Sequence, residues 1–210
     1  MTTSRPLPSR FRVAQRGVSL IVVLLILVIV SILGAGGAQI AMMAERGSRN
    51  DRDMQVAWQA AESALMDAEF EIHGRQGVAG LRQPMFTNMH ATNGFVAGCG
   101  HGNTDRGLCE LNRTGLPAWL SVDFSETDNN AKTVAFGEFT GRVFASSSGG
   151  TLVGVQPAQV PRYIIEPIED HAVDRDQAYG RSINYVFRVT AMGFGPRPDI
   201  RAVSQIIYRD

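Results

Sequence analysis

The sequence lacks the motifs that mark the large enzyme classes. It has no Ser/His/Asp order of a hydrolase, no glycine-rich phosphate-binding loop and no metalloprotease helix motif. The four histidines are scattered through predicted loops, at positions 73, 90, 101 and 171. We therefore predict that the chain is not an enzyme, and we expect no catalytic residue and no cofactor.

Lysine is nearly absent, since Lys132 stands alone against 19 arginines. Four of these arginines (5, 10, 12 and 16) precede residue 18, in a segment with no acidic residue. Without that segment, 16 basic and 20 acidic residues remain, a net charge of −4. No basic patch of the kind that nucleic-acid binding requires is evident.

Charge is also missing from residues 18–44, and residues 18–33 are Val, Leu and Ile apart from two serines. A helix of 27 residues is about 40 Å long, and the hydrocarbon core of a membrane is about 30 Å thick. The apolar run exceeds the 7–15 residues typical of a cleaved secretory signal. We expect a single membrane-spanning helix, with the arginine-rich end in the cytoplasm and the rest of the chain outside.

Cysteine occurs only twice, at Cys99 and Cys109, in the part predicted to lie outside the cytoplasm. A pair in an oxidising compartment is most simply a disulfide. Cys99, His101 and Cys109 could imitate a zinc cluster, but a fourth ligand at a recognised spacing is missing. We therefore predict a disulfide and no metal.

Two groups of acidic residues are weaker candidates for calcium. Neither has the spacing of an EF-hand loop, so solvated loop carboxylates are the expectation. The groups are Asp123, Glu126 and Asp128, and Asp170, Asp174 and Asp176.

The helical pattern continues beyond the apolar run, to about His73. Apolar residues recur at intervals of three and four along one face, which indicates an amphipathic helix half. They are Met54, Ala57, Ala61, Ala64, Leu65, Ala68 and Ile72. Gly34, Gly36 and Gly37 interrupt the apolar half, and two readings stay open: close helix packing in the membrane, or a weak point where the helix unwinds.

Two stretches carry a resemblance to a known family. Residues 16–21 read Arg-Gly-Val-Ser-Leu-Ile after a basic leader, which resembles the start of a type IV prepilin. Residues 50–65 contain Asp-Arg-Asp followed by Gln-Ala-Ala-Glu-Ser-Ala-Leu, which looks like the helix of PilX-type minor pilins. The resemblance covers about the first third of the chain.

The resemblance implies a processing site and one departure from the family pattern. A prepilin peptidase would cut after Gly17 and methylate the new amine of Val18. In ordinary pilins a glutamate occupies the place of Val22. A buried carboxylate needs a partner, and its proposed partner is the N-terminal ammonium of a neighbouring subunit. Valine cannot pair in this way, so we expect a subunit at or near the tip of the pilus.

The resemblance also implies partners and a location. The partners are the prepilin peptidase, the other minor pilins, the major pilin, a tip adhesin-like protein and the membrane. The chain would lie in the inner membrane with its C-terminal domain in the periplasm, and in the extracellular pilus after assembly. Adhesion, twitching motility and DNA uptake are family roles that the residues do not separate.

After His73 the composition turns to Gly, Asn, Thr and Pro through residue 107, where we expect no helix. Strands are predicted at residues 133–145, 162–168, 183–191 and 200–208, with residues 193–199 as a hairpin connection. Pro167 favours an edge or a strand terminus. The expected fold is α+β and pilin-like: a long N-terminal helix packed on an antiparallel sheet.

Four domains follow from this pattern. They are a cleaved leader (1–17), a transmembrane helix half (18–44), an amphipathic helix half (45–73) and a globular head (74–210). Two alternatives stay open: a pseudopilin of a type II secretion system, and a membrane-anchored periplasmic binding domain that forms no filament.

Overall fold

The computed structural model describes residues 18–74, 82–87, 92–144, 154–170 and 184–209. The chain divides into two units, residues 1–48 and 49–210, and helix α1 (Val18–His73) contributes to both. This is the helix that the periodicity predicts. The predicted leader, residues 1–17, lies outside the described residues.

The first unit is the N-terminal part of α1. Its Val, Leu and Ile side chains from 18 to 33 are exposed within the chain. Ser31 satisfies its hydroxyl locally, since Oγ donates to the Leu27 carbonyl at 2.7 Å. Among the described helices, α1 is long and apolar enough to cross a membrane. A surface of this kind requires lipid or neighbouring subunits to cover it.

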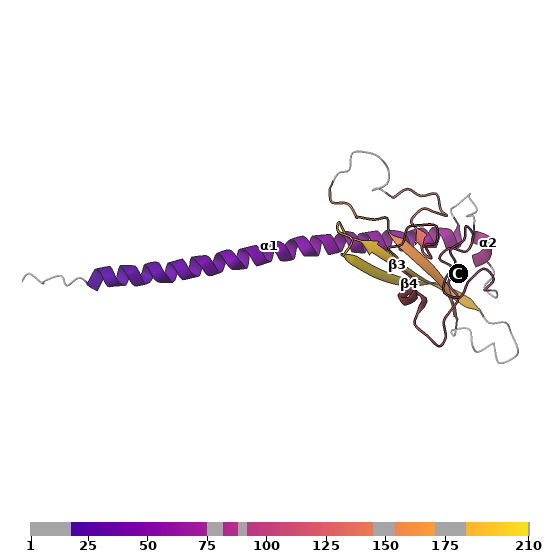
Figure 1. Cartoon of the computed structure of the whole chain (residues 1–210), viewed down its shortest axis with the longest axis horizontal. Coiled ribbons are helices and arrows are strands. Elements are labelled where there is room, and N and C mark those ends of the chain that lie inside the picture. The colour runs from indigo at the N-terminus through magenta and orange to yellow at the C-terminus, as the bar shows by residue number, and fades with distance from the viewer. Residues whose placement is uncertain (1–17, 75–81, 88–91, 145–153, 171–183, 210) are drawn as a thin grey trace, which may run out of the picture. The chain divides into compact units, whose positions relative to one another are not determined.

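The second unit is a sheet laid along the C-terminal part of α1 (Figure 1). Two short helices, α2 (Gln83–Phe86) and α3 (Ala118–Ser121), precede the strands. The strands are β1 (Val134–Ala135), β2 (Arg162–Glu169), β3 (Tyr185–Phe194) and β4 (Arg201–Tyr208). They pair antiparallel in the order β1-β2-β3-β4. The α+β class and the helix-on-sheet plan are confirmed.

Alanines make the contact between α1 and the sheet. The predicted apolar face is confirmed, since Ala57, Ala61, Ala64 and Ala68 are fully buried. Small side chains let the helix axis approach the strands closely. The approach is closest at Gly193 of β3, where an added Cβ would lie 2.1 Å from the Ala57 carbonyl oxygen.

The opposite face of the sheet is covered as well. The disulfide, α3 and Phe124 pack there against Ile164 and Phe194. Alternation along β3 places Thr190 on the polar face of the strand. Because this face is covered, Thr190 is nevertheless fully buried.

The disulfide loop also extends the sheet at β2. The Cys109 amide donates to the Ile165 carbonyl at 2.9 Å, and the Ile165 amide donates to the Gly107 carbonyl at 2.8 Å. The amides of residues two apart on a strand point toward the same side of that strand. Pro167 is two residues after Ile165, so the N–H that proline lacks would point to the side of β2 on which the disulfide loop pairs. Because β1 pairs only with Arg162 and Tyr163, Pro167 lies on a stretch that β1 leaves open.

The predicted strand at 133–145 is wrong beyond its first residues. Only Val134 and Ala135 pair with β2, and turns follow. Gly137 and Gly141 have positive φ angles of 82° and 68°, which extended strands do not use. The apolar residues that suggested a strand instead belong to a loop that folds against α1.

One short helix and one strand boundary also differ from the predictions. Residues 83–86 form the single turn of α2 inside a stretch expected to lack helix, where Pro84 suits a helix start. Strand β3 continues to Phe194, so the connection to β4 is shorter than residues 193–199 suggested. Its hairpin character is confirmed, because β3 and β4 are antiparallel neighbours.

The Cys99–Cys109 disulfide is confirmed, and both cysteines are buried. Replacing both by serine is expected to lower the free energy of unfolding by about 2–3 kcal/mol, because the unfolded chain gains the freedom of the open loop. Urea unfolding followed by tryptophan fluorescence measures this difference. Reduction of the wild-type protein should reproduce it, and an unchanged midpoint in both cases would contradict a stabilising bridge.

Candidate functional site

The residues singled out for processing lie at the start of α1. Val18 is the first helical residue and is exposed, and Gly17 lies outside the described residues. Val22 is 50% exposed on the same helix. Both valines therefore present their side chains to whatever surrounds the helix, lipid or another subunit.

The helix carries no charge that could replace the missing glutamate. From Val18 to Ala44 it has no acidic or basic side chain, and Glu45 is the first. Ser19 and Ser31 are the only hydroxyl side chains between residues 18 and 44, and a neutral hydroxyl does not neutralise an ammonium ion. A neighbour's terminal amine would find no ionic partner on this stretch.

The three glycines do not break the helix. Residues 34–37 stay helical, and a Cβ at Gly34, Gly36 or Gly37 would meet nothing within 4 Å inside the chain. No contact among the described residues therefore accounts for them. Both interpretations of the glycines, close packing against another helix and local unwinding, therefore stay open.

Among the described residues, the cysteine and histidine candidates form no group that could hold a metal ion. The two sulfurs are consumed in the disulfide, so they are not available as thiolate ligands. His101 contributes its carbonyl oxygen to Arg106 at 3.3 Å. His73 ends α1, and the two remaining histidines, at 90 and 171, lie outside the described residues.

Among the acidic candidates for calcium, Asp123 and Asp128 serve local turns. Asp123 accepts from the Ser125 hydroxyl and amide, and these hydrogen bonds hold the pKa of that carboxyl below its usual value. Asp128 accepts from the Asn130 amide at 2.8 Å. Asp170 pairs with Arg209 at 2.8 Å. Asp174 and Asp176 lie outside the described residues.

The sequence did not reveal a buried ion pair between Glu71 and Arg82. Both side chains are only 1% exposed, and Arg82 Nε donates to Glu71 Oε1 at 2.5 Å. The Tyr163 hydroxyl donates to the other carboxylate oxygen at 2.5 Å. Burial raises the pKa of Glu71, while Arg82 and Tyr163 oppose that rise. Burial also raises the pKa of Tyr163 well above its ordinary value.

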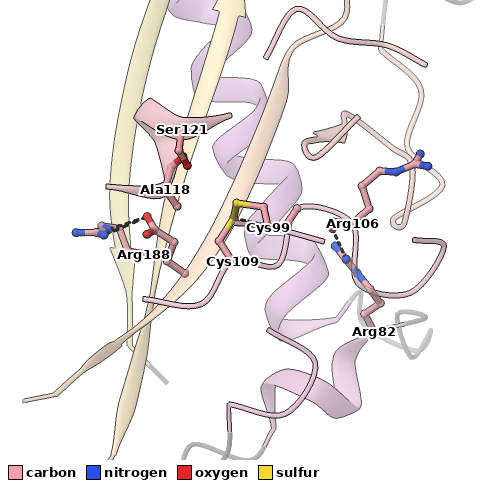
Figure 2. Close-up of a disulfide and its surroundings, with 9 residues drawn as sticks. Arg82, Cys99, Arg106, Cys109, Ala118, Ser121 and Arg188 are labelled. Atoms are coloured by element: carbon pink, nitrogen blue, oxygen red, sulfur yellow. Dashed lines mark hydrogen bonds and ion pairs between the residues drawn. A yellow bond between two sulfur atoms is a disulfide. The ribbon is translucent and has the colours of Figure 1, made fainter. Parts of the chain in front are cut away.

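Arg82 connects three parts of the second unit. Its Nη1 donates to the Arg106 carbonyl at 2.6 Å, within the disulfide loop, as Figure 2 shows. Its guanidinium lies 3.6 Å from the centre of the Phe139 ring, a cation–π contact. Helix α1, the disulfide loop and the loop after β1 therefore meet at one arginine.

A second buried carboxylate, Asp67, lies one turn before Glu71. It accepts from the Gly137 amide at 2.7 Å and from the Thr140 hydroxyl at 2.5 Å, and Arg142 lies 3.5 Å away. Burial raises the pKa of Asp67, and these partners act against it. These hydrogen bonds hold the loop after β1 on the helix and explain why that segment is not a strand.

A third buried carboxylate, Glu166, lies directly across the sheet from Arg188. Arg188 Nη2 lies 3.1 Å from Glu166 Oε2, and Figure 2 labels the arginine of this ion pair. The sequence held weak signals for these groups. Asp67 and Glu71 are spaced by four beside the apolar face of α1, and Glu166 interrupts an apolar strand. No feature of the neighbouring sequence indicated that Arg82 is buried in an ion pair.

The contacts of these three carboxylates join separate segments of the second unit. Each of the three is engaged by a basic or hydroxyl group from another segment. The arrangement fixes loops to α1 and to the sheet.

Two family models match the chain. The model described as "PilX N-terminal" matches residues 16–65, and the model described as "Type IV pilus assembly protein PilX C-term" matches residues 48–210. Together they run from the end of the predicted leader to the last residue. No curated protein and no solved structure matches the chain.

Proposed function

Because the chain belongs to the PilX family of type IV pilus assembly proteins, we propose that it is a minor pilin located at or near the pilus tip. There it would join the complex that primes assembly and presents an adhesin-like protein. The family is a structural pilin family, and the matches to it favour the pilus over a type II secretion system.

Val22 is the observation that carries the tip location. A subunit inside the filament gains from a carboxylate that neutralises the terminal amine of a neighbour in an apolar environment. Valine offers packing but no charge at this position. The loss matters least for a subunit that has no neighbour above it, which is the first subunit of the filament.

The exposed apolar half of α1 supports membrane anchoring before assembly. Its Val, Leu and Ile side chains from 18 to 33 are exposed, and the arginines precede it. The proposal is a cytoplasmic leader, a membrane helix at 18–44 and a head in the periplasm, which becomes extracellular in the pilus. The peptidase would act between Gly17 and Val18.

The first experiment is intact mass and N-terminal sequencing of the protein from membranes, with and without the prepilin peptidase. We expect an N-methylated Val18 that disappears when the peptidase is absent. A chain that keeps its leader in both strains would support a plain membrane anchor, and the argument from Val22 would fail with it.

Location is tested with a labelled protein and a Val22→Glu variant. We expect the wild-type label at pilus ends, and a share of the variant along the shaft, because the restored carboxylate can neutralise a neighbour's amine. The control variant is Val23→Glu, which places the same charge on another side of the helix. The protein with this substitution should not enter the shaft. A wild-type label spread along pili, unchanged by Val22→Glu, would contradict the tip location.

A further inference from the structure

Strand β4 (Arg201–Tyr208) is an outer strand of the sheet, with β3 on one side. Among the described residues, no backbone group outside β3 bonds to residues 201–208. Ile206 and Ile207 are 40% and 56% exposed. The strand is eight residues long and contains no proline and no lysine, which proteins commonly use to protect an open edge.

One stripe of α1 flanks this open edge. Positions 58, 62, 65 and 69 follow the spacing that places residues on one side of a helix. Two contacts fix that side toward β4: the Ser204 hydroxyl donates to Glu62 at 2.7 Å, and the Tyr208 hydroxyl donates to the Leu65 carbonyl at 3.0 Å.

The stripe carries negative charge beside apolar surface. Glu62 and Glu69 are exposed, and Trp58 at the start of the stripe is 47% exposed. Burial and the charges of Glu69 and Glu62 together raise the pKa of Tyr208 to about 12. The field of the two carboxylates therefore reaches the last residue of β4.

We propose that β4 binds an extended segment of a partner polypeptide, which adds as a further strand and places arginines along the stripe of Glu62, Glu69 and Trp58. The backbone of β4 would supply the main-chain hydrogen bonds of strand addition. An arginine stem packs on Ile206, and its guanidinium pairs with a carboxylate or stacks on Trp58. Alternate residues of the segment lie beside Ile207 on the other face, where apolar side chains fit.

A second copy of this chain fits the edge less well. Pairing of β4 with β4 would bring the α1 stripes of two copies toward each other. The exposed glutamates of both would then face like charges, which is unfavourable. Charge complementarity therefore favours a partner segment with basic residues at every second position.

The test uses the full-length chain in zwitterionic detergent and three labelled peptides. One alternates arginine and valine, one alternates glutamate and valine, and one is the arginine peptide with every second amide N-methylated. We expect the arginine peptide to bind at least about tenfold more tightly than the glutamate peptide, and more weakly at high salt. N-methylation should abolish binding, because it removes the main-chain donors.

The Glu62→Arg, Glu69→Arg variant should reverse the preference between the two charged peptides. Glu110→Arg changes an exposed carboxylate elsewhere and should leave the preference unchanged. Hydrogen exchange should slow within residues 201–208 on binding. Equal affinity for all three peptides, protection elsewhere, or a preference that the double variant does not alter would overturn the proposal.

Discussion

Replacing Arg82 by methionine is expected to lower the free energy of unfolding of the second unit by about 3–5 kcal/mol. Glu71 would remain 1% exposed without its cation, and a buried charge without a partner is among the most destabilising features a protein can contain. The Tyr163 hydroxyl alone does not offset that cost. Trp58 and Trp119 both lie in this unit, so urea unfolding by tryptophan fluorescence reports it.

The pH dependence of that variant has a definite sign. The pKa of Glu71 is already raised in the folded protein, and the loss of Arg82 removes the first cause that opposes the rise. A carboxyl with a raised folded pKa favours folding at low pH, and that contribution is lost as the pH rises through the folded pKa. The difference between wild type and Arg82→Met should therefore shrink as the pH falls toward the ordinary range of a glutamate.

Two control variants separate the effect of leaving a buried carboxylate without its partner from the effect of removing a charge. Arg113→Met removes an ion pair with Glu169 in which the arginine is 64% exposed, so the expected cost is below about 1 kcal/mol. Adding Glu71→Met to Arg82→Met removes both charges and should recover a large part of the stability. A single variant as stable as wild type at neutral pH would contradict the buried pair.

The second large effect is expected at Gly193. A Cβ there would lie 2.1 Å from the Ala57 oxygen and 2.3 Å from the Ala61 nitrogen, and both are backbone atoms that no rotamer change can move. Gly193→Ala must push α1 away from β3 and loosen the alanine contact along its length. We expect a loss of about 3 kcal/mol or more in the free energy of unfolding.

The matched control is Gly36→Ala, because an added Cβ there meets nothing within 4 Å and stays helical. It should leave the unfolding of the second unit unchanged. Tryptophan fluorescence in urea gives both values under the same conditions. If Gly193→Ala unfolds at the wild-type midpoint, the close approach of β3 to α1 does not exist in solution.

Local pattern was sufficient for much of the fold. The charge-free run and the three-and-four spacing of alanines predicted α1, because both signals repeat within a few residues. Alternation predicted β3, the stretches of β2 and β4 were also predicted as strands, and two cysteines in an oxidising compartment predicted one bridge. The same local logic failed after Val134, since Gly137 and Thr140 satisfy Asp67, a residue far away in the sequence.

The candidate functional residues divide in the same way. Val18 and Val22 could be named from the sequence, because their meaning depends on a motif and on the absence of charge nearby. The pair of Glu71 and Arg82 could not, since Tyr163, which completes it, is 92 residues from the glutamate. Which arginine meets a buried carboxylate depends on how loops cross the helix, and sequence periodicity does not carry that information.

The sequence by itself therefore determined the long apolar helix, the disulfide and the family, each through composition or spacing over short distances. Only the tertiary structure decided which carboxylates are buried, why β3 needs a glycine against α1, and which strand is left at the edge. An open edge is a property of strand order, and strand order follows from packing between distant segments. For this reason the surface of β4 beside Glu62 and Glu69 could be recognised only in the folded chain.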